Sequence, residues 1–174
     1  MYKRILVSSL FLLNSNVIAN EHFIANVSVF DYTFRHSDVN PSAIIIGYGS
    51  ELMENVDFQF RIGTGVYARG DGTYSSYGRE HSLEQIIGAY LIGRLPIESS
   101  FKPYAIIGAS HLKFEYSYQY SSGSQSSSSN DISYGAGFDY NFTNSSSMTI
   151  EYITYTDNDD FQANALSVGY KLKF

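Results

Sequence analysis

Nine charged residues fall on the polar side of segments in which polar and apolar side chains alternate. Successive side chains of a β-strand point to opposite faces, so the alternation assigns all nine to one face of a sheet. If that sheet closes into a narrow barrel, the face becomes the interior, where an unpaired charge is costly. We therefore expect acids and bases to pair across an interior. The residues are Asp57, Arg61, Glu84, Arg94, Lys113, Glu115, Asp139, Glu151 and Lys171.

Arg61 and Glu151 lie near the middle of their segments, so we expect them at similar heights in one charge cluster, whether or not they touch. Glu84, Asp139 and Lys171 are expected as further members. Two interpretations stay open. The network is either a static plug that fills the interior or a gate, in which an exchange of ion-pair partners opens a path for water.

Other chemistries find little support. A lipid-facing hydrolase would need a serine within reach of a histidine that a carboxylate orients. Residues two apart on a strand share a face, but no histidine here has a serine at that spacing. There is no cysteine to bind a metal, and the acidic run 157–160 lacks the spacing and glycine of a calcium loop. We predict no catalytic residue, no cofactor and no metal site. The histidines considered are His22, His36, His81 and His111.

The first 19 residues have the three parts of a secretory signal peptide. Lys3 and Arg4 precede an apolar run that ends at Leu13, and Val17 and Ala19 are the small residues that signal peptidase requires. A membrane-spanning helix would need about 20 apolar residues, which this run does not reach. We predict cleavage after Ala19, which leaves residues 20–174 as a single domain.

The remaining chain is acidic. Cleavage would remove two of the 11 basic residues and none of the 17 acidic ones, so 9 bases would face 17 acids. Binding to nucleic acid requires clustered Lys and Arg, and no such cluster is present. The balance therefore argues against a nucleic-acid partner.

The strands must position the charged residues, and their pattern is regular. Segments of about ten residues with two-residue alternation are separated by turns, and an even number of them is typical of barrels in bacterial outer membranes.

Two segments depart from the simple pattern. Phe30, Tyr32 and Phe34 break the order of the first segment and predict a bulge there. The Ser-rich segment 121–130 is expected in a surface loop, as a contact site or a solvated spacer. The eight predicted strands are 23–34, 42–51, 56–69, 82–95, 102–118, 132–142, 148–156 and 164–174.

Alternation alone does not separate a membrane barrel from a soluble one whose apolar face points inward. Glycines on the polar faces suit a narrow, side-chain-filled interior, and aromatic residues recur near strand ends, where they would meet lipid headgroups. We therefore expect the apolar faces to meet lipid. Eight residues represent this face: Phe58, Phe60, Ile62, Phe138, Tyr140, Val168, Tyr170 and Leu172. The expected aromatic girdle includes Tyr104 and Tyr155.

The last strand resembles the assembly signal of outer-membrane proteins, in which alternating apolar residues end on an aromatic residue. The matching residues are Val168, Tyr170, Leu172 and Phe174. The segments 102–108, 133–140 and 148–152 also resemble strands of the outer-membrane protein A-like and opacity-type barrels, and the likeness is to the barrel domain alone. It implies an all-β, eight-stranded antiparallel transmembrane barrel with periplasmic termini, folded by the barrel-assembly machinery.

Four surface loops are expected at 35–41, 70–81, 119–131 and 157–163, with short periplasmic turns at 52–55, 96–101 and 143–147. The expected function is a non-enzymatic platform for these loops in the bacterial outer membrane, which supports membrane integrity or surface interaction. The alternative is a narrow porin-like channel with an interior charge gate, and an enzyme that modifies lipid A is the third possibility. Expected partners are outer-membrane lipid and lipopolysaccharide, and the chain is expected to be a monomer.

Overall fold

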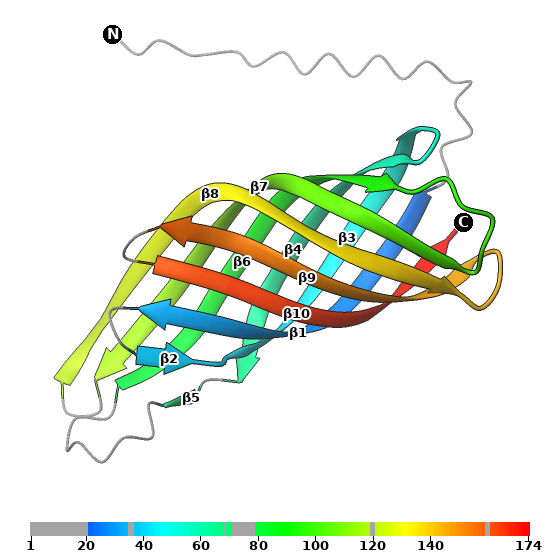
Figure 1. The fold of residues 1–174 in the computed structure, drawn as a ribbon. Coiled ribbons are helices and arrows are strands. Elements are labelled where there is room, and N and C mark those ends of the chain that lie inside the picture. Colours follow the sequence, from blue (N-terminus) through cyan, green and yellow to red (C-terminus); the bar gives the residue numbers. More distant parts are fainter. Residues whose placement is uncertain (1–20, 35–36, 68, 71–78, 119–120, 159–160) are drawn as a thin grey trace, which may run out of the picture.

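The computed structural model describes residues 21–174 except 35–36, 68, 71–78, 119–120 and 159–160. Ten strands form one antiparallel sheet, and eight of them make the wall (Figure 1). Among the described residues, no helix is long and apolar enough to cross a bilayer. The wall strands are β1 (Glu21–Phe34), β3 (Ser42–Met53), β4 (Val56–Tyr67), β6 (Arg79–Arg94), β7 (Phe101–Tyr118), β8 (Ser121–Asn141), β9 (Ser146–Asn158) and β10 (Phe161–Lys173), and the short strands are β2 (Ser37–Val39) and β5 (Arg69–Gly70).

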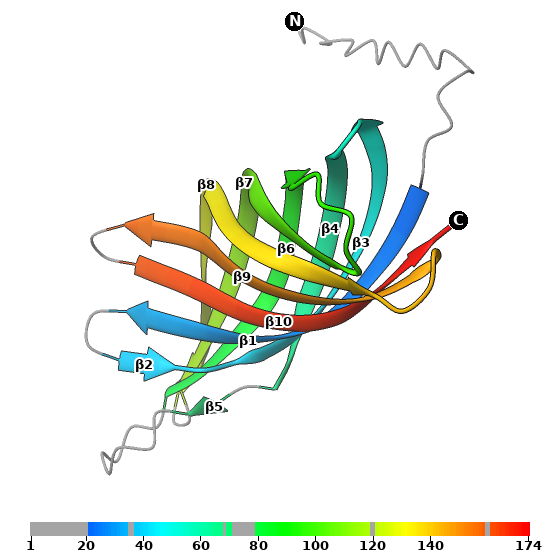
Figure 2. The ribbon, with the colours of Figure 1, turned by 45° about the vertical axis from the view of Figure 1, so that its right-hand side comes forward.

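The sheet closes on itself. Its strand order is β10-β9-β8-β7-β6-β4-β3-β1, and β10 also pairs with β1, from His22 opposite Lys173 to Phe34 opposite Phe161. The start of β1 and the end of β10 therefore lie side by side at one end of the barrel, which we call the terminus end (Figure 2). The opposite end is called the far end. The eight-stranded antiparallel barrel predicted from the alternation is confirmed.

All four far-end connections differ from the prediction, because strands extend into each of the predicted loops. β2 lies within the loop predicted at 35–41, and β6 begins at Arg79, within the loop predicted at 70–81. β7 and β8 continue as a paired ladder almost to their shared connection, so the Ser-rich segment 121–130 is strand rather than loop. The connection between β9 and β10 is similarly reduced to residues 159–160. Serine carries little strand preference of its own, and cross-strand pairing with β7 supplies the hydrogen bonds that extend the strand.

The bulge predicted in the first strand is wrong. β1 pairs with β10 and with β3 without any shift of register. Phe30 and Tyr32 keep the strict alternation and point into the barrel, where they are fully buried. Shifts of register lie elsewhere, among them those at Glu84 in β6, beside Ala163 in β10 and between Ser42 and Ala43 in β3. The interior is apolar at this height, so inward-pointing residues here are aromatic rather than polar. In the sequence this looks the same as a shift of register by one residue.

The outer face is apolar, as predicted. Seven of the eight expected residues are exposed on it, and Phe138 lies there under the ring of Phe101, with ring centroids 4.6 Å apart. A closed sheet with an apolar outer face and charged side chains enclosed in its interior has the polarity of a membrane barrel, which is the reverse of a soluble one.

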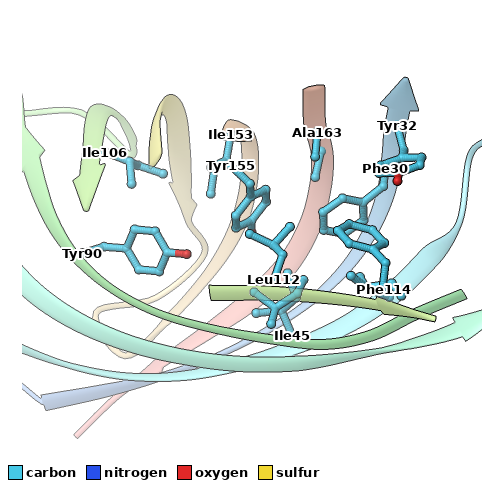
Figure 3. Close-up of a cluster of buried hydrophobic side chains, with 14 of the residues drawn as sticks. Phe30, Tyr32, Ile45, Tyr90, Ile106, Leu112, Phe114, Ile153, Tyr155 and Ala163 are labelled. Atoms are coloured by element: carbon cyan, nitrogen blue, oxygen red, sulfur yellow. The ribbon is translucent and has the colours of Figure 1, made fainter. Parts of the chain in front are cut away.

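The interior is filled by two layers of different polarity. The buried charged side chains lie in the half near the terminus end, where Ile92 and Ile106 are buried beside them, and the half near the far end holds mostly apolar and aromatic side chains. Figure 3 shows part of the apolar cluster, with Phe30, Tyr155 and Leu112 among its members. In the apolar half, Phe30 stacks on Tyr155 at 5.4 Å between ring centroids, and Tyr32 lies against Phe114 at 4.7 Å. We call this half the apolar plug; its members include Phe30, Tyr32, Ile45, Leu83, Ile86, Leu112, Phe114, Ile153 and Tyr155.

The outer face generates a first prediction. Ile62 lies midway along β4 with Ile46 and Ile87 opposite it on the neighbouring strands. Ile62→Arg should lower the free energy of unfolding by about 2–4 kcal/mol in lipid vesicles, because a charge near the bilayer midplane is poorly solvated. Asp31→Arg, at an exposed position beyond the last outward valine of β1, should cost about 0–1 kcal/mol. Urea unfolding in vesicles measures both, and equal costs would contradict a membrane-embedded wall.

Candidate functional site: the interior charge network

A buried ion pair joins opposite parts of the barrel wall. Arg61 on β4 and Glu151 on β9 meet through two hydrogen bonds, Nη1 to Oε2 at 2.7 Å and Nη2 to Oε1 at 2.9 Å. Each side chain is 1% exposed. Two parallel bonds between a guanidinium and a carboxylate are among the stronger charge-assisted contacts in proteins. The pair therefore links strands that are not neighbours in the sheet.

Neutral polar groups complete the coordination of this pair. Arg61 donates from Nη2 and Nε to Gln59 Oε1, at 2.6 Å and 3.0 Å. Glu151 accepts from the Tyr104 hydroxyl at 2.8 Å and from Asn26 Nδ2 at 3.0 Å. A buried charge is tolerated when its remaining donors and acceptors are satisfied in this way.

A second group of charges lies closer to the terminus end. Arg94 donates from both terminal nitrogens to the two carboxylate oxygens of Asp57. Lys171 Nζ donates to Asp139 Oδ2 at 2.5 Å, and Arg94 Nε lies 3.7 Å from the same oxygen. These contacts bring four charges from four strands into one group.

His22 and Gln59 connect the two groups. Gln59 Nε2 and His22 Nε2 are 2.9 Å apart, and His22 Nε2 also lies 3.6 Å from Asp57 Oδ2. The whole network contains three cations, Arg61, Arg94 and Lys171, and three anions, Asp57, Asp139 and Glu151. Its formal charge is therefore balanced when the histidine is neutral.

The structure places most of the predicted members in this network. Arg61, Asp139, Glu151 and Lys171 belong to it, and Arg61 and Glu151 touch directly, which the sequence did not require. Glu84 does not belong to it. It lies at a bulge on the outer face, where Lys113 Nζ donates to its Oε1 at 2.9 Å.

Lys113 and Glu115 were also predicted inside and are not. On β7 the neighbouring Leu112 and Phe114 are the buried residues, so the odd-numbered positions face outward. The prediction assumed that an apolar face always meets lipid, and near the far end that assumption fails because the interior is apolar too.

The neutral members of the network were missed. Tyr104 and Tyr155 were assigned to the aromatic girdle, but both are buried in the interior. Asn26 and Gln59 are neutral and demand no ion-pair partner, and His22 was considered only as a possible catalytic residue. Asn26 and Gln59 do sit on the polar side of their strands, and that position was the only signal available.

Two glycines on the inner face make room for these side chains. A Cβ atom at Gly49 would lie 2.5 Å from His22 Nε2 and 2.7 Å from Gln59 Cγ. At Gly137 it would lie 2.9 Å from two ring atoms of Tyr104. Contacts this short are not tolerated, so the absence of a side chain at both positions lets the network approach the wall.

What this arrangement can do chemically is limited. Its carboxylates are neutralised by basic side chains, and in the part of the chain that the structure describes no three histidine or acidic residues could together hold a metal ion. The network fills and braces the lumen.

The chain belongs to the family described as the outer membrane protein beta-barrel domain, which it matches over residues 16–174. No curated protein sequence matches it. Similar solved structures include the attachment invasion locus protein Ail of Yersinia pestis, with 16% identity, a TM-score of 0.65, and coverage of 90% of this chain and 99% of Ail. These findings and the apolar outer face indicate a protein of the bacterial outer membrane.

Two further structures share the fold. Neisserial surface protein A has 18% identity and a TM-score of 0.63, with 88% of this chain and 97% of that one covered. OprG of Pseudomonas aeruginosa has 11% identity and a TM-score of 0.62, with 90% and 96% covered. At these identities the likeness shows the fold alone.

The ion pair generates a second prediction. Arg61→Ala should lower the free energy of unfolding by about 3–5 kcal/mol, because Glu151 would keep its charge in a dry site without its partner. Lys113→Ala removes a partly exposed partner on the outer face and should cost about 0–1 kcal/mol. The measurement is urea unfolding of the refolded barrel in detergent.

A double variant separates loss of the pair from loss of packing. Arg61→Met with Glu151→Gln leaves no buried charge at this position, so it should recover most of the stability that Arg61→Ala loses. If the double variant is as unstable as Arg61→Ala, the isolated charge is not the cause of the loss.

Proposed function

We propose that this chain is a closed, non-enzymatic outer-membrane barrel that holds its far-end hairpins and loops at the cell surface. The observation that carries the proposal is the filling of the lumen along its length. The charge network occupies one half and the apolar plug the other, and Phe30 and Tyr155 at the centre of the plug are both 0% exposed. A barrel filled in this way serves as a rigid support rather than a passage.

The rival function, a channel gated by the charge network, requires more than an exchange of ion-pair partners. An ion that passed the Arg61–Glu151 pair would then meet the apolar plug, whose hydrocarbon side chains and aromatic rings replace little of its hydration shell, so the cost of entry is high. The gate would have to open two unrelated barriers at once. The layered interior therefore favours the static interpretation of the network.

The third possibility, an enzyme acting on lipid A, would need a histidine on the lipid-facing side. His22 is enclosed in the lumen, within the charge network, and His111 contacts Asn130 on the outer wall. His36 and His81 have side chains outside the described residues. His111 is on the outer wall, but the group at its Nδ1 is the amide of Asn130, whereas a catalytic histidine is oriented by a carboxylate. The enclosure of His22 and the amide partner of His111 support a non-enzymatic role.

We further propose that both termini are periplasmic, so that the far end faces the cell exterior. The connections at the terminus end are short, at 54–55, 95–100 and 142–145, as is usual for the periplasmic side. Residues 1–19, which lie outside the described residues, serve in this proposal as a cleaved export signal. Val168, Tyr170, Leu172 and Phe174 lie exposed on the outer side of the closing strand, available to the barrel-assembly machinery.

A conductance experiment tests the closed-platform proposal. In planar bilayers the native barrel should show no steady current of porin size, and Arg61→Ala should show none either, because the apolar plug remains. Phe30→Ala with Tyr155→Ala should increase conductance, since it removes two stacked rings from the plug. Phe60→Ala, on the outer face, is the control.

The same experiment can refute the proposal. Steady porin-size conductance of the native barrel would do so. An increase for Arg61→Ala equal to that of the double plug variant would instead support the charge gate. Heat-modifiable migration on gels verifies that each variant is folded before it is measured.

Export gives a separate prediction. Protein recovered from outer membranes should have the mass of residues 20–174, with Asn20 as its first residue. Replacing Ala19 by Arg should leave the precursor uncut, because the cleavage enzyme requires a small residue at that position. Intact-mass spectrometry distinguishes the two forms, and a mature native protein that still contains residues 1–19 would contradict the prediction.

A further inference from the structure

His22 lies in the lumen where the two groups of charges meet, and its ring is enclosed there, with the residue 2% exposed. Nε2 of the ring is 2.9 Å from Gln59 Nε2 and 3.6 Å from Asp57 Oδ2, and only the first of these distances is that of a hydrogen bond. An amide nitrogen donates and does not accept, so the ring Nε2 must be the acceptor. His22 is therefore neutral in this arrangement, with its proton on Nδ1.

The orientation of the Gln59 amide is fixed from its other side. Arg61 donates from Nη2 and Nε to Gln59 Oε1, at 2.6 Å and 3.0 Å. If the amide turned over, its nitrogen would face these N–H groups and both bonds would be lost. Arg61 is itself held by two hydrogen bonds to Glu151. The chain of donors and acceptors from Glu151 through Arg61 and Gln59 thus requires a neutral His22.

The charges around the ring also oppose the uptake of a proton. On the inner face of the described wall strands near the terminus end, five bases already face four acids. The bases are Arg61, Arg94, Lys102, Lys171 and Lys173, and the acids are Glu51, Asp57, Asp139 and Glu151. Asp57 is close to the ring, but both of its carboxylate oxygens accept from Arg94. A protonated His22 adds a positive charge to an enclosed site in which this carboxylate already has a partner.

We propose that His22 is a proton-sensitive link between the two groups of charges, which joins them when its ring is neutral and separates them when its ring is protonated. A proton from solvent adds to the lone pair of Nε2, and the new N–H group then faces the N–H group of Gln59. Because Arg61 prevents the amide from turning over, the ring must leave Gln59. The imidazolium then competes with Arg94 for Asp57. Acid thus loosens the network near the terminus end, whichever side of the membrane that end faces.

The direction of the effect on stability follows from proton binding. In an unfolded chain a histidine takes up a proton below pH about 6.5. The folded barrel resists this proton, so just below that pH the unfolded state binds more protons than the folded state, and stability falls as the pH falls. Carboxyl groups in unfolded chains titrate near pH 4, so a loss that begins near pH 6.5 is specific to histidine.

The protonation state of His22 can be measured in the native barrel without any substitution. In detergent micelles, ¹⁵N NMR of protein labelled at histidine should show, at about pH 7.5, a neutral His22 ring with its proton on Nδ1. His22→Gln assigns the signals, because they disappear in that variant. A charged ring at this pH, or a neutral ring with its proton on Nε2, would overturn the inference.

Urea unfolding in the same micelles measures the effect of pH on stability. The folding equilibrium constant of the native barrel should fall by up to about tenfold between about pH 6.5 and 5.5, the limit for one proton. His22→Gln should lose this dependence, because the new amide does not titrate and can still accept from Gln59. His111→Gln, on the outer wall, should retain it. An undiminished dependence in His22→Gln would mean that another group takes up the proton, and the proposal would fail.

Gln59→Glu should reverse the direction of the effect. A carboxylate accepts from both Arg61 and a protonated His22, so acid should raise the folding equilibrium constant of this variant over the same range. A loss equal to that of the native barrel would contradict the role of Gln59. Conductance of the same samples tests the closed barrel separately, so a closed barrel whose stability does not change between about pH 6.5 and 5.5 refutes this link alone.

Discussion

Hydrocarbon offers no partner for a backbone N–H or C=O group, so each membrane-spanning strand must be hydrogen-bonded along both edges. In this chain the requirement is met by the pairing of β1 with β10, which removes the two edges that an open sheet would expose. Closure with eight strands leaves a lumen that side chains fill. Every inward-pointing charge is then enclosed, and the pairing of charges inside follows from the pairing of strands in the wall.

The Arg61–Glu151 pair has a structural consequence beyond its own energy. Buried ion pairs contribute little net stability compared with well-packed apolar residues, because desolvation offsets much of their attraction. The two side chains come from strands that are not adjacent, so both hydrogen bonds form only when the intervening strands are in register. A slip of one residue would turn either side chain toward lipid. The pair therefore selects the native register more than it raises stability.

Sequence reasoning recovered the wall and part of its contents. The eight strands, the outward face and four of the five proposed network members followed from two-residue alternation, because alternation states directly which side chains share a face. Alternation does not show which of the two faces points into the barrel and which points outward. Near the far end the interior is apolar and the outer face is polar, so Lys113, Glu115 and Phe30 were misread, and Glu84 was displaced by a bulge that leaves no mark in the sequence. Contacts of neutral groups such as Tyr104 with Glu151 depend on the curvature of the closed wall, which a strand pattern does not contain.

The lumen contains a charge network and an apolar plug, and the two can serve different properties of the barrel: the register of its strands and its permeability. In the proposed closed barrel, register is specified by the charge network, where each charge has a particular partner, and permeability is limited by the apolar plug, where Phe30, Tyr155 and their neighbours exclude water by packing. The same apolar layer lets β7 place Leu112 and Phe114 inside and so turns His111 and Lys113 outward. The polarity of the interior thus determines which polar groups the outer wall presents to lipid.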